Sequence, residues 1–399
     1  MSDELTPALW VTGPAGVGKT TVAWELYADL VDSGVEVGYV DIDQLGMCFP
    51  EPESDPGRYR TAAQNLGSVV AGYRAAGARG VIVSGVVDPT RGVHLDRMPN
   101  VVVTTCRLRA DADDLRRRLT ARQSDPAYIT RALAEADALD ASDLKDSCID
   151  TTGLPVGRVV ALTRERTAGW MDPAALTTPA GVAGPPAVGD AAGGPILWLC
   201  GPTGVGKSSV GFNFFLRHVL GAKISGAFVD LDQIGFYRSR ASRGVDHRMR
   251  AQILADMWRT FRAAGAECLT LVGPAEDATA ISTYVRALPA ATFTVCRLHA
   301  TPEELAYRIR LRGAGGSWSQ PGDPLKGQPD EVLTAAAERA AADAAALQQA
   351  TVGDRCVDTT RRSVDDVADA ILAETGWPAG GAHVSSADCG VRESWARPV

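Results

Sequence analysis

The chain alternates short apolar runs with longer amphipathic stretches. Residues 81–84 and 101–105 are continuous Val/Ile-rich runs, which are typical of strands buried on both faces of a parallel sheet. In the first half the pattern predicts strands at 8–12, 36–41, 81–84, 101–105 and 147–150, helices at 20–33, 112–122 and 156–167, and a helical hairpin region before Gly77. Alternating strands and helices predict an α/β fold, in which helices flank a mainly parallel sheet.

The same pattern returns in the second half of the chain. Residues 9–20 (LWVTGPAGVGKT) recur as 197–208 (LWLCGPTGVGKS), and 40–46 recur as 229–235. Shorter matches follow in the same order, namely RAAGA, CRL, DTT and GW at 74–78, 106–108, 150–152 and 169–170, and again at 262–266, 296–298, 358–360 and 376–377. We interpret the chain as a tandem duplication.

The repeat sets the expected domain boundaries. We expect one domain at 1–176, a flexible Ala-, Gly- and Pro-rich linker at 177–195, a second domain at 196–378 and a poorly ordered tail at 379–399. The second copy is longer between its CRL and DTT matches, where residues 313–329 form a Gly-rich insertion.

Composition narrows the class of protein. The 399 residues are 45% hydrophobic and 22% charged, with a net charge of −8, so the chain can bury a core and lacks the excess of positive charge that binds a nucleic-acid backbone. No apolar run approaches the ~20 residues that span a membrane. The first residues carry acids and no apolar core, so we expect no secretory signal.

The spacing of cysteines and histidines does not predict a metal site. The eight cysteines contain no Cys-x-x-Cys pair, and the five histidines have no ligand-like spacing. Most cysteines lie in apolar runs, which favours reduced thiols and a cytoplasmic protein.

The strongest signal is a Gly-x-x-x-x-Gly-Lys-Ser/Thr motif, which occurs twice between a predicted strand and a predicted helix. Its glycines let backbone N–H groups surround phosphate oxygens, and the helix N-terminus adds partial positive charge. We expect Lys19 and Lys207 to reach the β- and γ-phosphates of ATP (GTP stays open), and Thr20 and Ser208 to bind Mg²⁺. The predicted nucleotide contacts are Gly13, Ala15, Gly16, Val17, Gly18, Lys19, Thr20 and Thr21, and in the second copy Gly201, Thr203, Gly204, Val205, Gly206, Lys207, Ser208 and Ser209.

An Asp-x-Asp motif follows the second predicted strand of each copy. It comprises Asp41 and Asp43, and then Asp230 and Asp232. Alternation along the strand points both carboxylates to one side, at the sheet edge where such folds bind ligands. We expect one acid to serve Mg²⁺ and the other to accept a proton or hydrogen bond. The alternative is a pair of acids that cap the loop.

Together with an Arg-x-x-x-Arg helix, these motifs resemble the small-molecule kinases of the P-loop superfamily, such as shikimate, gluconate and adenylylsulfate kinases and the chloramphenicol phosphotransferases. The resemblance covers nearly all of each copy. It implies that Asp41 and Asp230 serve the Mg²⁺ and that Asp43 and Asp232 contact the acceptor hydroxyl. The third strands end in Val-Ser-Gly (83–85) and Leu-Val-Gly (271–273), so no acid stands in the Walker B place. We therefore expect metal binding by the strand-two acids, and the identity of the base stays open.

The arginine helix carries Arg118 and Arg122, which match Arg308 and Arg312 on one helix face. The resemblance implies that these arginines neutralise the migrating phosphoryl group next to a lid. The alternative is a solvated basic face. The insertion at 313–329 is expected to be either a lid or a surface loop, and the first copy has only a short run at 123–127.

The acceptor pocket is expected after each Asp-x-Asp. Arg60 and Arg248 share an Arg-x-x-Ala-Gln-x-Leu pattern and are predicted to hold an anionic group. Nearby residues differ between the copies: Met47, Cys48 and Phe49 in the first, and Phe236, Tyr237, Arg238, Arg240, Arg243 and His247 in the second. A more anionic acceptor is therefore expected for the second copy. The Asp-Thr-Thr triplets are expected either beside the adenine or as caps of the next helix.

We therefore expect two fused P-loop kinase-like domains, in contact with each other, that transfer the γ-phosphoryl group of ATP to a hydroxyl or phosphate of a small molecule or nucleotide. No nucleic-acid or membrane partner is expected. One alternative is an ATPase or switch without an acceptor. A second is one active copy beside a degenerate one, and a third is a polynucleotide or toxin-like kinase, of which the acidic charge disfavours the polynucleotide version.

Overall fold

The computed structural model describes residues 5–122, 124–142, 147–172, 193–237, 245–316 and 323–378. The chain forms two compact units. Unit 1 comprises Met1–Gly46, Glu53–Ala187 and Gln233–Met249, and unit 2 comprises Met47–Pro52, Val188–Asp232 and Arg250–Val399. Each unit therefore follows one half of the sequence and also includes a short segment of the other half. Most of the predicted linker and all of the predicted tail lie outside the described residues.

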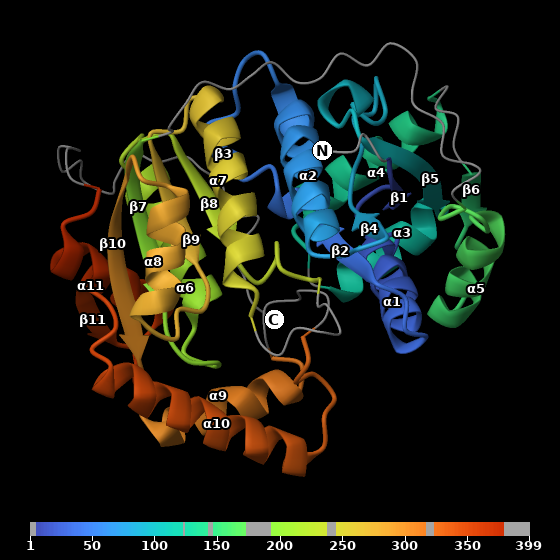
Figure 1. The fold of residues 1–399 in the computed structure, drawn as a ribbon. Coiled ribbons are helices and arrows are strands. Elements are labelled where there is room, and N and C mark those ends of the chain that lie inside the picture. Colours follow the sequence, from blue (N-terminus) through green and yellow to red (C-terminus); the bar gives the residue numbers. More distant parts are fainter. Residues whose placement is uncertain are drawn as a thin grey trace. The chain divides into compact units, whose positions relative to one another are not determined.

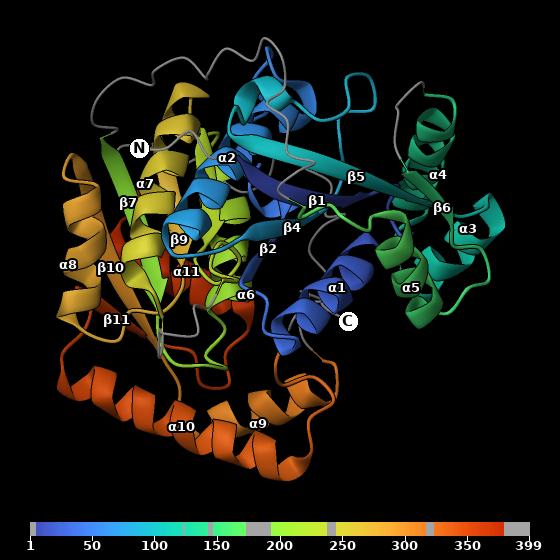
Figure 2. The same ribbon diagram turned by 45° about the vertical axis from the view of Figure 1, so that its right-hand side comes forward.

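Unit 1 is built on a five-stranded parallel sheet in the order β2-β4-β1-β5-β6 (Figure 1). Helices α1 and α5 lie side by side on one face of this sheet, and α2 lies on the other (Figure 2). Its strands are β1 (Thr6–Thr12), β2 (Val37–Asp41), β4 (Gly80–Ser84), β5 (Val101–Arg109) and β6 (Ser147–Asp150), and its helices are α1 (Lys19–Asp32), α2 (Tyr59–Ala75), α3 (Ala112–Ala121), α4 (Pro126–Asp140) and α5 (Val156–Arg166).

The strand register brings the carboxyl ends of three strands of unit 1 together at one edge of the sheet. Ser84 pairs with Val11 on one side and with Asp41 on the other, so the carboxyl ends of β1, β4 and β2 meet where the phosphate loop begins. The strands are held by a core of buried apolar side chains that includes Leu9, Ile82 and Leu108. The predicted α/β class with a mainly parallel sheet is confirmed.

Unit 2 repeats this strand order as β8-β9-β7-β10-β11 and adds the antiparallel strand β3 beside β8. At its carboxyl edge Val272 pairs with Leu199 and with Asp230. Helices α6 and α11 pack together, as do α9 and α10. The strands are β3 (Cys48–Phe49), β7 (Gly194–Cys200), β8 (Gly226–Asp230), β9 (Cys268–Val272), β10 (Ala291–His299) and β11 (Arg355–Asp358), and the helices are α6 (Lys207–Phe214), α7 (His247–Ala263), α8 (Ala278–Ala287), α9 (Pro302–Gly313), α10 (Asp330–Gln349) and α11 (Val364–Thr375).

The predicted helical hairpin before Gly77 is wrong. One long helix, α2, fills the second part of this region, and the first part holds β3 and the short 3₁₀ helices Ile42–Gln44 and Pro56–Arg58. Prolines and the left-handed Gly57 (φ 75°) interrupt helix formation there.

Helix α4 was not predicted. Among the described residues, no helix is both long and apolar enough to cross a lipid bilayer.

Phe236 and Tyr237, from the segment Gln233–Met249 that is counted with unit 1, cover the free edge of β2. The backbone N–H of Tyr39 donates to the Phe236 carbonyl at 3.1 Å. The Phe236 ring lies 5.3 Å from Trp24 and 5.7 Å from Tyr39. The buried Tyr237 donates its hydroxyl to Glu36 Oε2 at 2.7 Å. This segment thus occupies backbone groups that an uncovered sheet edge would expose.

Unit 2 has a corresponding edge segment, Met47–Pro52. The Phe228 N–H donates to the Met47 carbonyl at 2.9 Å, and Phe49 packs 6.2 Å from Phe215. Cys48 is buried. The residues directly after the first Asp-x-Asp therefore complete the sheet of unit 2, and those after the second Asp-x-Asp cover the edge of unit 1.

This exchange predicts that the first half of the sequence is unstable on its own. A polypeptide of residues 5–176 leaves the β2 edge and the Trp24 and Tyr39 rings uncovered, so we expect it to aggregate or to unfold without cooperativity. Joining residues 233–249 to its end through a flexible linker should restore a cooperative transition. Circular dichroism and size-exclusion chromatography measure both properties, with a scrambled 233–249 segment as the control. An equally stable monomer with the native, scrambled or absent segment would contradict the prediction.

Candidate active site

Each phosphate loop has a backbone that only glycine adopts readily. Gly13 and Gly201, which open the loops, have φ values of 139° and 145°. A Cβ on Gly13 would lie 2.2 Å from the Leu108 carbonyl oxygen, and one on Gly201 would lie 2.6 Å from that of Leu298. The neighbouring strand therefore approaches too closely for a side chain, and the loop's shape is set by glycine at these positions.

The helices that follow the loops begin without a side-chain cap among the described residues. Their N-cap residues, Gly18 and Gly206, are left-handed. The first backbone N–H groups of α1 and α6 are consequently open toward an anion. Lys19 Nζ donates to the Pro14 carbonyl at 3.0 Å, and Lys207 Nζ donates to the Gly201 carbonyl at 2.9 Å, so both lysines fold back over their loops. Burial lowers the pKa of Lys207.

A hydroxyl and a carboxylate meet beside each loop. Thr20 Oγ1 donates to Asp41 Oδ2 at 3.3 Å, and Ser208 Oγ donates to Asp230 Oδ2 at 2.6 Å. The other oxygen, Oδ1, accepts the backbone N–H of the residue two positions on, at 3.0 Å in unit 1 and 2.9 Å in unit 2. The first acid of each motif therefore caps the turn with one oxygen and faces the loop hydroxyl with the other.

These first acids are buried and short of positive charge. Burial raises the pKa of Asp41 to about 7 and that of Asp230 to about 6, and the neighbouring acid of each motif adds to the effect. A cation beside the carboxylate would favour its ionised form. Hydroxyl and carboxylate oxygens are ligands that Mg²⁺ accepts. The residues present thus fit a Mg²⁺ ion at Thr20 and Asp41, and at Ser208 and Asp230.

The second acid of each motif is exposed, and in unit 2 it forms an ion pair with an arginine. The Asp232 side chain is 54% exposed and pairs with Nη1 of the buried Arg250 at 3.0 Å. Sequence reasoning did not select Arg250. The available signal was the shared Arg-x-x-Ala-Gln-x-Leu pattern, which aligns Arg250 with Ala62. Asp43 therefore has no equivalent arginine at that position.

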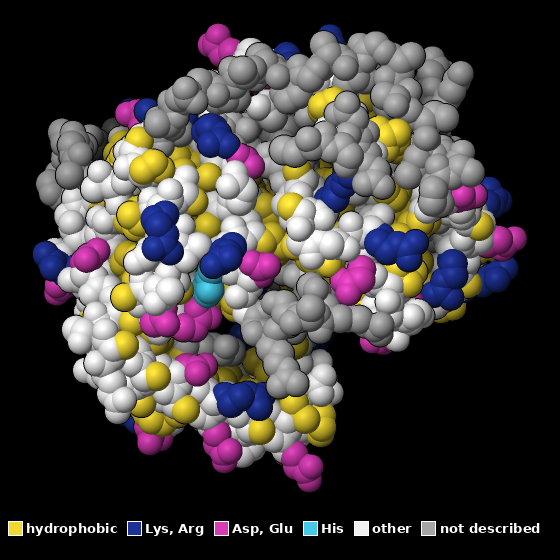
Figure 3. Space-filling view, in the orientation of Figure 1, with side chains coloured by type: hydrophobic (Ala, Val, Ile, Leu, Met, Phe, Trp, Pro, Cys, Tyr) yellow, Lys and Arg dark blue, Asp and Glu magenta, His cyan; other side chains and the backbone are white. Residues whose placement is uncertain are grey.

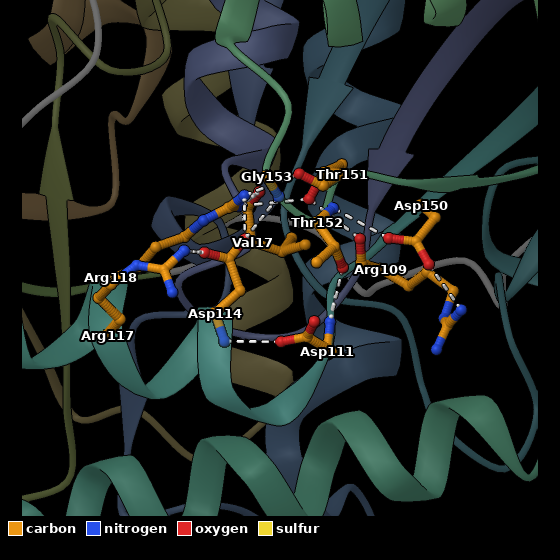
Figure 4. Close-up of polar contacts among 10 residues, drawn as sticks. All are labelled: Val17, Arg109, Asp111, Asp114, Arg117, Arg118, Asp150, Thr151, Thr152 and Gly153. Atoms are coloured by element: carbon orange, nitrogen blue, oxygen red, sulfur yellow. Dashed lines mark hydrogen bonds and ion pairs between the residues drawn. The ribbon is translucent and has the colours of Figure 1, made fainter.

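The first arginine of the helical pair connects two loops (Figure 4). Arg118 Nη1 donates to the Val17 carbonyl at 3.0 Å, and Nη2 donates to the Thr151 carbonyl at 2.9 Å. Its guanidinium also pairs with the buried Asp114, Nη2 to Oδ2, at 2.6 Å. Arg118 therefore ties the phosphate loop to the Asp-Thr-Thr loop. Contact of this side chain with a phosphoryl group stays a prediction.

Arg308 makes the same connection in unit 2. It donates to the Val205 carbonyl at 3.0 Å and to the Thr359 carbonyl at 2.7 Å, and Glu304 accepts from its Nε at 2.9 Å. The acids that hold these arginines, Asp114 and Glu304, were not selected from the sequence. Each lies four residues before its arginine on the same helix, which is a spacing that favours ion pairs.

The second arginines of the helices have different surroundings. Arg122 is exposed at the end of α3. Arg312 binds Asp323 with two hydrogen bonds, Nε to Oδ2 at 3.1 Å and Nη2 to Oδ1 at 3.0 Å. Asp323 belongs to the predicted insertion, whose residues 317–322 lie outside the described part of the chain. The insertion's role as a lid stays a prediction.

The Asp-Thr-Thr triplets shape their own turns rather than capping the next helix. Asp150 Oδ1 accepts the N–H of Thr152 at 2.9 Å, and Thr152 Oγ1 accepts the N–H of Asp111 at 2.9 Å. Helix α5 has Pro155 at its N-cap. The capping alternative is therefore wrong for this helix, and the adenine contact stays a prediction.

The residues expected around the acceptor are divided between the two units, and the acceptor pocket itself stays a prediction. Cys48 and Phe49 belong to unit 2, and Phe236 and Tyr237 belong to unit 1, so these four residues serve the exchanged edges. Arg60 is half-buried in the first turn of α2, while Arg248 is exposed and belongs to the segment counted with unit 1. His247, the first residue of α7, is counted with the same segment, and Arg238, Arg240 and Arg243 lie outside the described residues.

Positive charge on the described surface is mixed with negative charge. On the face drawn in Figure 3, Lys and Arg side chains stand among acidic and uncharged ones. Binding along a nucleic-acid backbone uses clustered basic residues instead. The expected absence of a nucleic-acid partner nevertheless stays a prediction.

No protein-family model and no curated protein matches the chain. Its fold is similar to solved structures that include a tunicamycin resistance protein from Deinococcus radiodurans (19% identity, 41% of this chain and 96% of that one, TM-score 0.32). Others are a sugar kinase from Janibacter (20%, 43% and 99%, 0.30) and a gluconokinase from Sinorhizobium meliloti (17%, 42% and 93%, 0.30). Similarities of this degree do not indicate a substrate.

The raised pKa of Asp41 predicts that the ligand-free protein loses stability as the pH rises. Between the ordinary value of 3.8 and about 7, the folded state keeps a proton that the unfolded state has released, so the free energy of unfolding falls across this window. Asp41→Asn should remove this contribution to the pH dependence of the free energy of unfolding. It should also stabilise the protein at mildly alkaline pH by about 2 kcal/mol. Urea unfolding at a series of pH values in EDTA measures the free energy of unfolding. The control is Asp113→Asn, whose side chain is 91% exposed; parallel pH curves for wild type and Asp41→Asn would contradict the prediction.

The loop connection made by Arg118 predicts a large effect on stability. Arg118→Ala leaves the buried Asp114 without one of its cations and removes donors from two loop carbonyls, so the free energy of unfolding should fall by about 2–3 kcal/mol. Arg116→Ala, which removes an arginine that is 56% exposed on the same helix, should change it by less than about 0.5 kcal/mol. Chemical denaturation monitored by fluorescence measures both variants, and equal effects would refute the assignment.

Proposed function

We propose that the chain is an ATP- and Mg²⁺-dependent phosphotransferase that moves a γ-phosphoryl group to a hydroxyl or phosphate of a small molecule or nucleotide. One observation carries the proposal. In each unit the hydroxyl that follows the loop lysine contacts a buried carboxylate at the end of the second parallel strand along the chain (β2 or β8), at 3.3 Å for Thr20 and Asp41 and at 2.6 Å for Ser208 and Asp230. A phosphate loop, a lysine and a metal-binding oxygen pair are the parts that phosphoryl transfer requires.

The loop residues bind and orient the nucleotide in this proposal. Backbone N–H groups of the loops, with Lys19 and Lys207, hold the β- and γ-phosphates. Thr20 with Asp41, and Ser208 with Asp230, hold Mg²⁺, which neutralises phosphate charge when bound. Arg118 and Arg308 keep each loop in register with the loop after the last strand, so the phosphates meet a preorganised set of donors.

The exposed second acids face the acceptor in this proposal. Asp232 is close enough to Lys207 for its charge to raise the pKa of that lysine against the effect of burial. Asp43 and Asp232 are therefore suited to accept a hydrogen bond from an acceptor hydroxyl as the phosphoryl group arrives. Asp232 pairs with Arg250, whereas the charge of Arg58 acts on Asp43, so each second acid lies near a different arginine. That difference also suits the alternative in which only one unit is catalytic.

The decisive experiment screens candidate acceptors with labelled ATP on wild type, Lys19→Ala, Lys207→Ala and the double variant. Each substitution should reduce transfer by its own unit about 100-fold or more, because the lysine charge offsets the migrating phosphoryl group. Partial loss in each single variant indicates two active units, and complete loss in one indicates a single active unit. Omitting the acceptor is the control. ATP hydrolysis that does not depend on any acceptor would overturn the kinase proposal in favour of an ATPase or switch.

A further inference from the structure

A chain of buried hydroxyl groups ends on the metal-facing oxygen of Asp41. Ser84 Oγ lies 2.9 Å from Asp41 Oδ2, and the Tyr39 hydroxyl lies 2.8 Å from Ser84 Oγ. This is the same oxygen that accepts from Thr20. Tyr39 and Ser84 are both fully buried, at 0% exposure. Unit 1 therefore supports its first acid from inside the sheet as well as from the phosphate loop.

The direction of these hydrogen bonds follows from the chemistry of the groups. When Asp41 holds a cation its carboxylate is ionised and only accepts, and serine has a single hydroxyl proton. Ser84 therefore donates to Asp41, and Tyr39 donates to Ser84. Hydrogen bonds to a charged acceptor are stronger than neutral ones, and a second donor behind the first polarises it further.

Strand pairing holds both hydroxyl groups in place. Ser84 ends β4 and is paired directly with Asp41 on β2. Tyr39 lies on the same strand as Asp41, two residues earlier, and its carbonyl accepts the Tyr73 hydroxyl at 3.1 Å. Its ring packs 5.1 Å from Trp24. Because the donors belong to the rigid sheet, they restrict rotation of the Asp41 carboxylate.

Unit 2 lacks both hydroxyl groups at the matching positions. The sheet register pairs Asp230 with Val272, as it pairs Asp41 with Ser84. Phe228 stands two residues before Asp230, where unit 1 has Tyr39. The two changes occur together, as expected if Tyr39 and Ser84 act as one group.

We propose that Ser84 is a positioning residue for Asp41 and that Tyr39 acts through Ser84, so that unit 1 holds its catalytic cation differently from unit 2. The inference rests on the proposed function, because it assigns Asp41 Oδ2 to the cation. Ser84 stands in the place where the resembled kinases were expected to show an acid. Ser84 donates its proton to Asp41 at 2.9 Å, so in this proposal it orients the acid that holds the cation.

The test uses the full chain with Lys207→Ala and Ser208→Ala, which removes one nucleotide contact and one cation contact of unit 2. Ser84→Val, Tyr39→Phe, their combination and Ser84→Thr are compared in this parent. Electron paramagnetic resonance of Mn²⁺ with ADP measures cation affinity, and steady-state kinetics gives kcat and the KM for ATP. Tyr73→Phe is the matched control, because it removes a buried tyrosine hydroxyl that donates to the Tyr39 backbone carbonyl and not to the side-chain hydroxyls that lead to Asp41.

Ser84→Val is expected to weaken Mn²⁺ binding and to lower kcat, each by about tenfold, with less than a twofold change in KM. Tyr39→Phe should have about a threefold effect on its own and none in the Ser84→Val protein. Ser84→Thr keeps the hydroxyl and should restore both properties. Tyr73→Phe should alter only thermal stability.

Several outcomes would overturn the proposal. Unchanged Mn²⁺ affinity in Ser84→Val, or an undiminished effect of Tyr39→Phe in that background, contradicts the hydroxyl chain. If Ser84→Val does not fold, Ser84→Ala replaces it, and equal Mn²⁺ affinity in the Ala and Thr variants overturns the proposal. Normal Mn²⁺ binding without transfer in the parent defeats the proposed function of unit 1, while the binding comparison still decides the role of Ser84.

Discussion

A buried negative charge at the end of the second strand is the constraint on which both sites depend. Asp41 and Asp230 are almost fully buried, and a carboxylate in such a place is costly unless donors or cations compensate it. The capping N–H, the loop hydroxyl and the nearby lysine each reduce that cost. Their arrangement concentrates polar groups at one sheet edge, where the glycine loop and the open helix N-terminus provide positive potential for phosphate.

The acids of the two motifs have different additional partners in the two units. Unit 1 places the hydroxyl chain of Ser84 and Tyr39 behind Asp41, and unit 2 places Arg250 beside Asp232. A hydroxyl donor orients a carboxylate without removing its charge, whereas an arginine offsets the charge as well. Near-identical loop sequences thus have different hydrogen-bond partners around their acids in the two units.

The exchanged edge segments give the residues after each Asp-x-Asp motif a role that their sequence position does not reveal. An exposed strand edge is unfavourable because its backbone donors and acceptors lack partners. Covering β2 uses Phe236 and Tyr237, and extending the sheet beside β8 uses Cys48 and Phe49. Those residues follow the Asp-x-Asp motifs in sequence, yet each pair belongs to the unit that does not contain its own motif.

The sequence by itself determined the parallel α/β class, most strand and helix positions, and the glycine loops with their lysines, hydroxyls and acids. These features depend on local patterns, because periodicity reports burial and a loop of fixed spacing carries its own geometry. Only the tertiary structure decided that Arg118 ties two loops together, that Arg250 holds Asp232, and that each edge is covered by a segment from the other half. Such pairings depend on which distant backbone and side-chain groups meet in the folded chain, and apolar patterning records that a residue is buried without recording its partner.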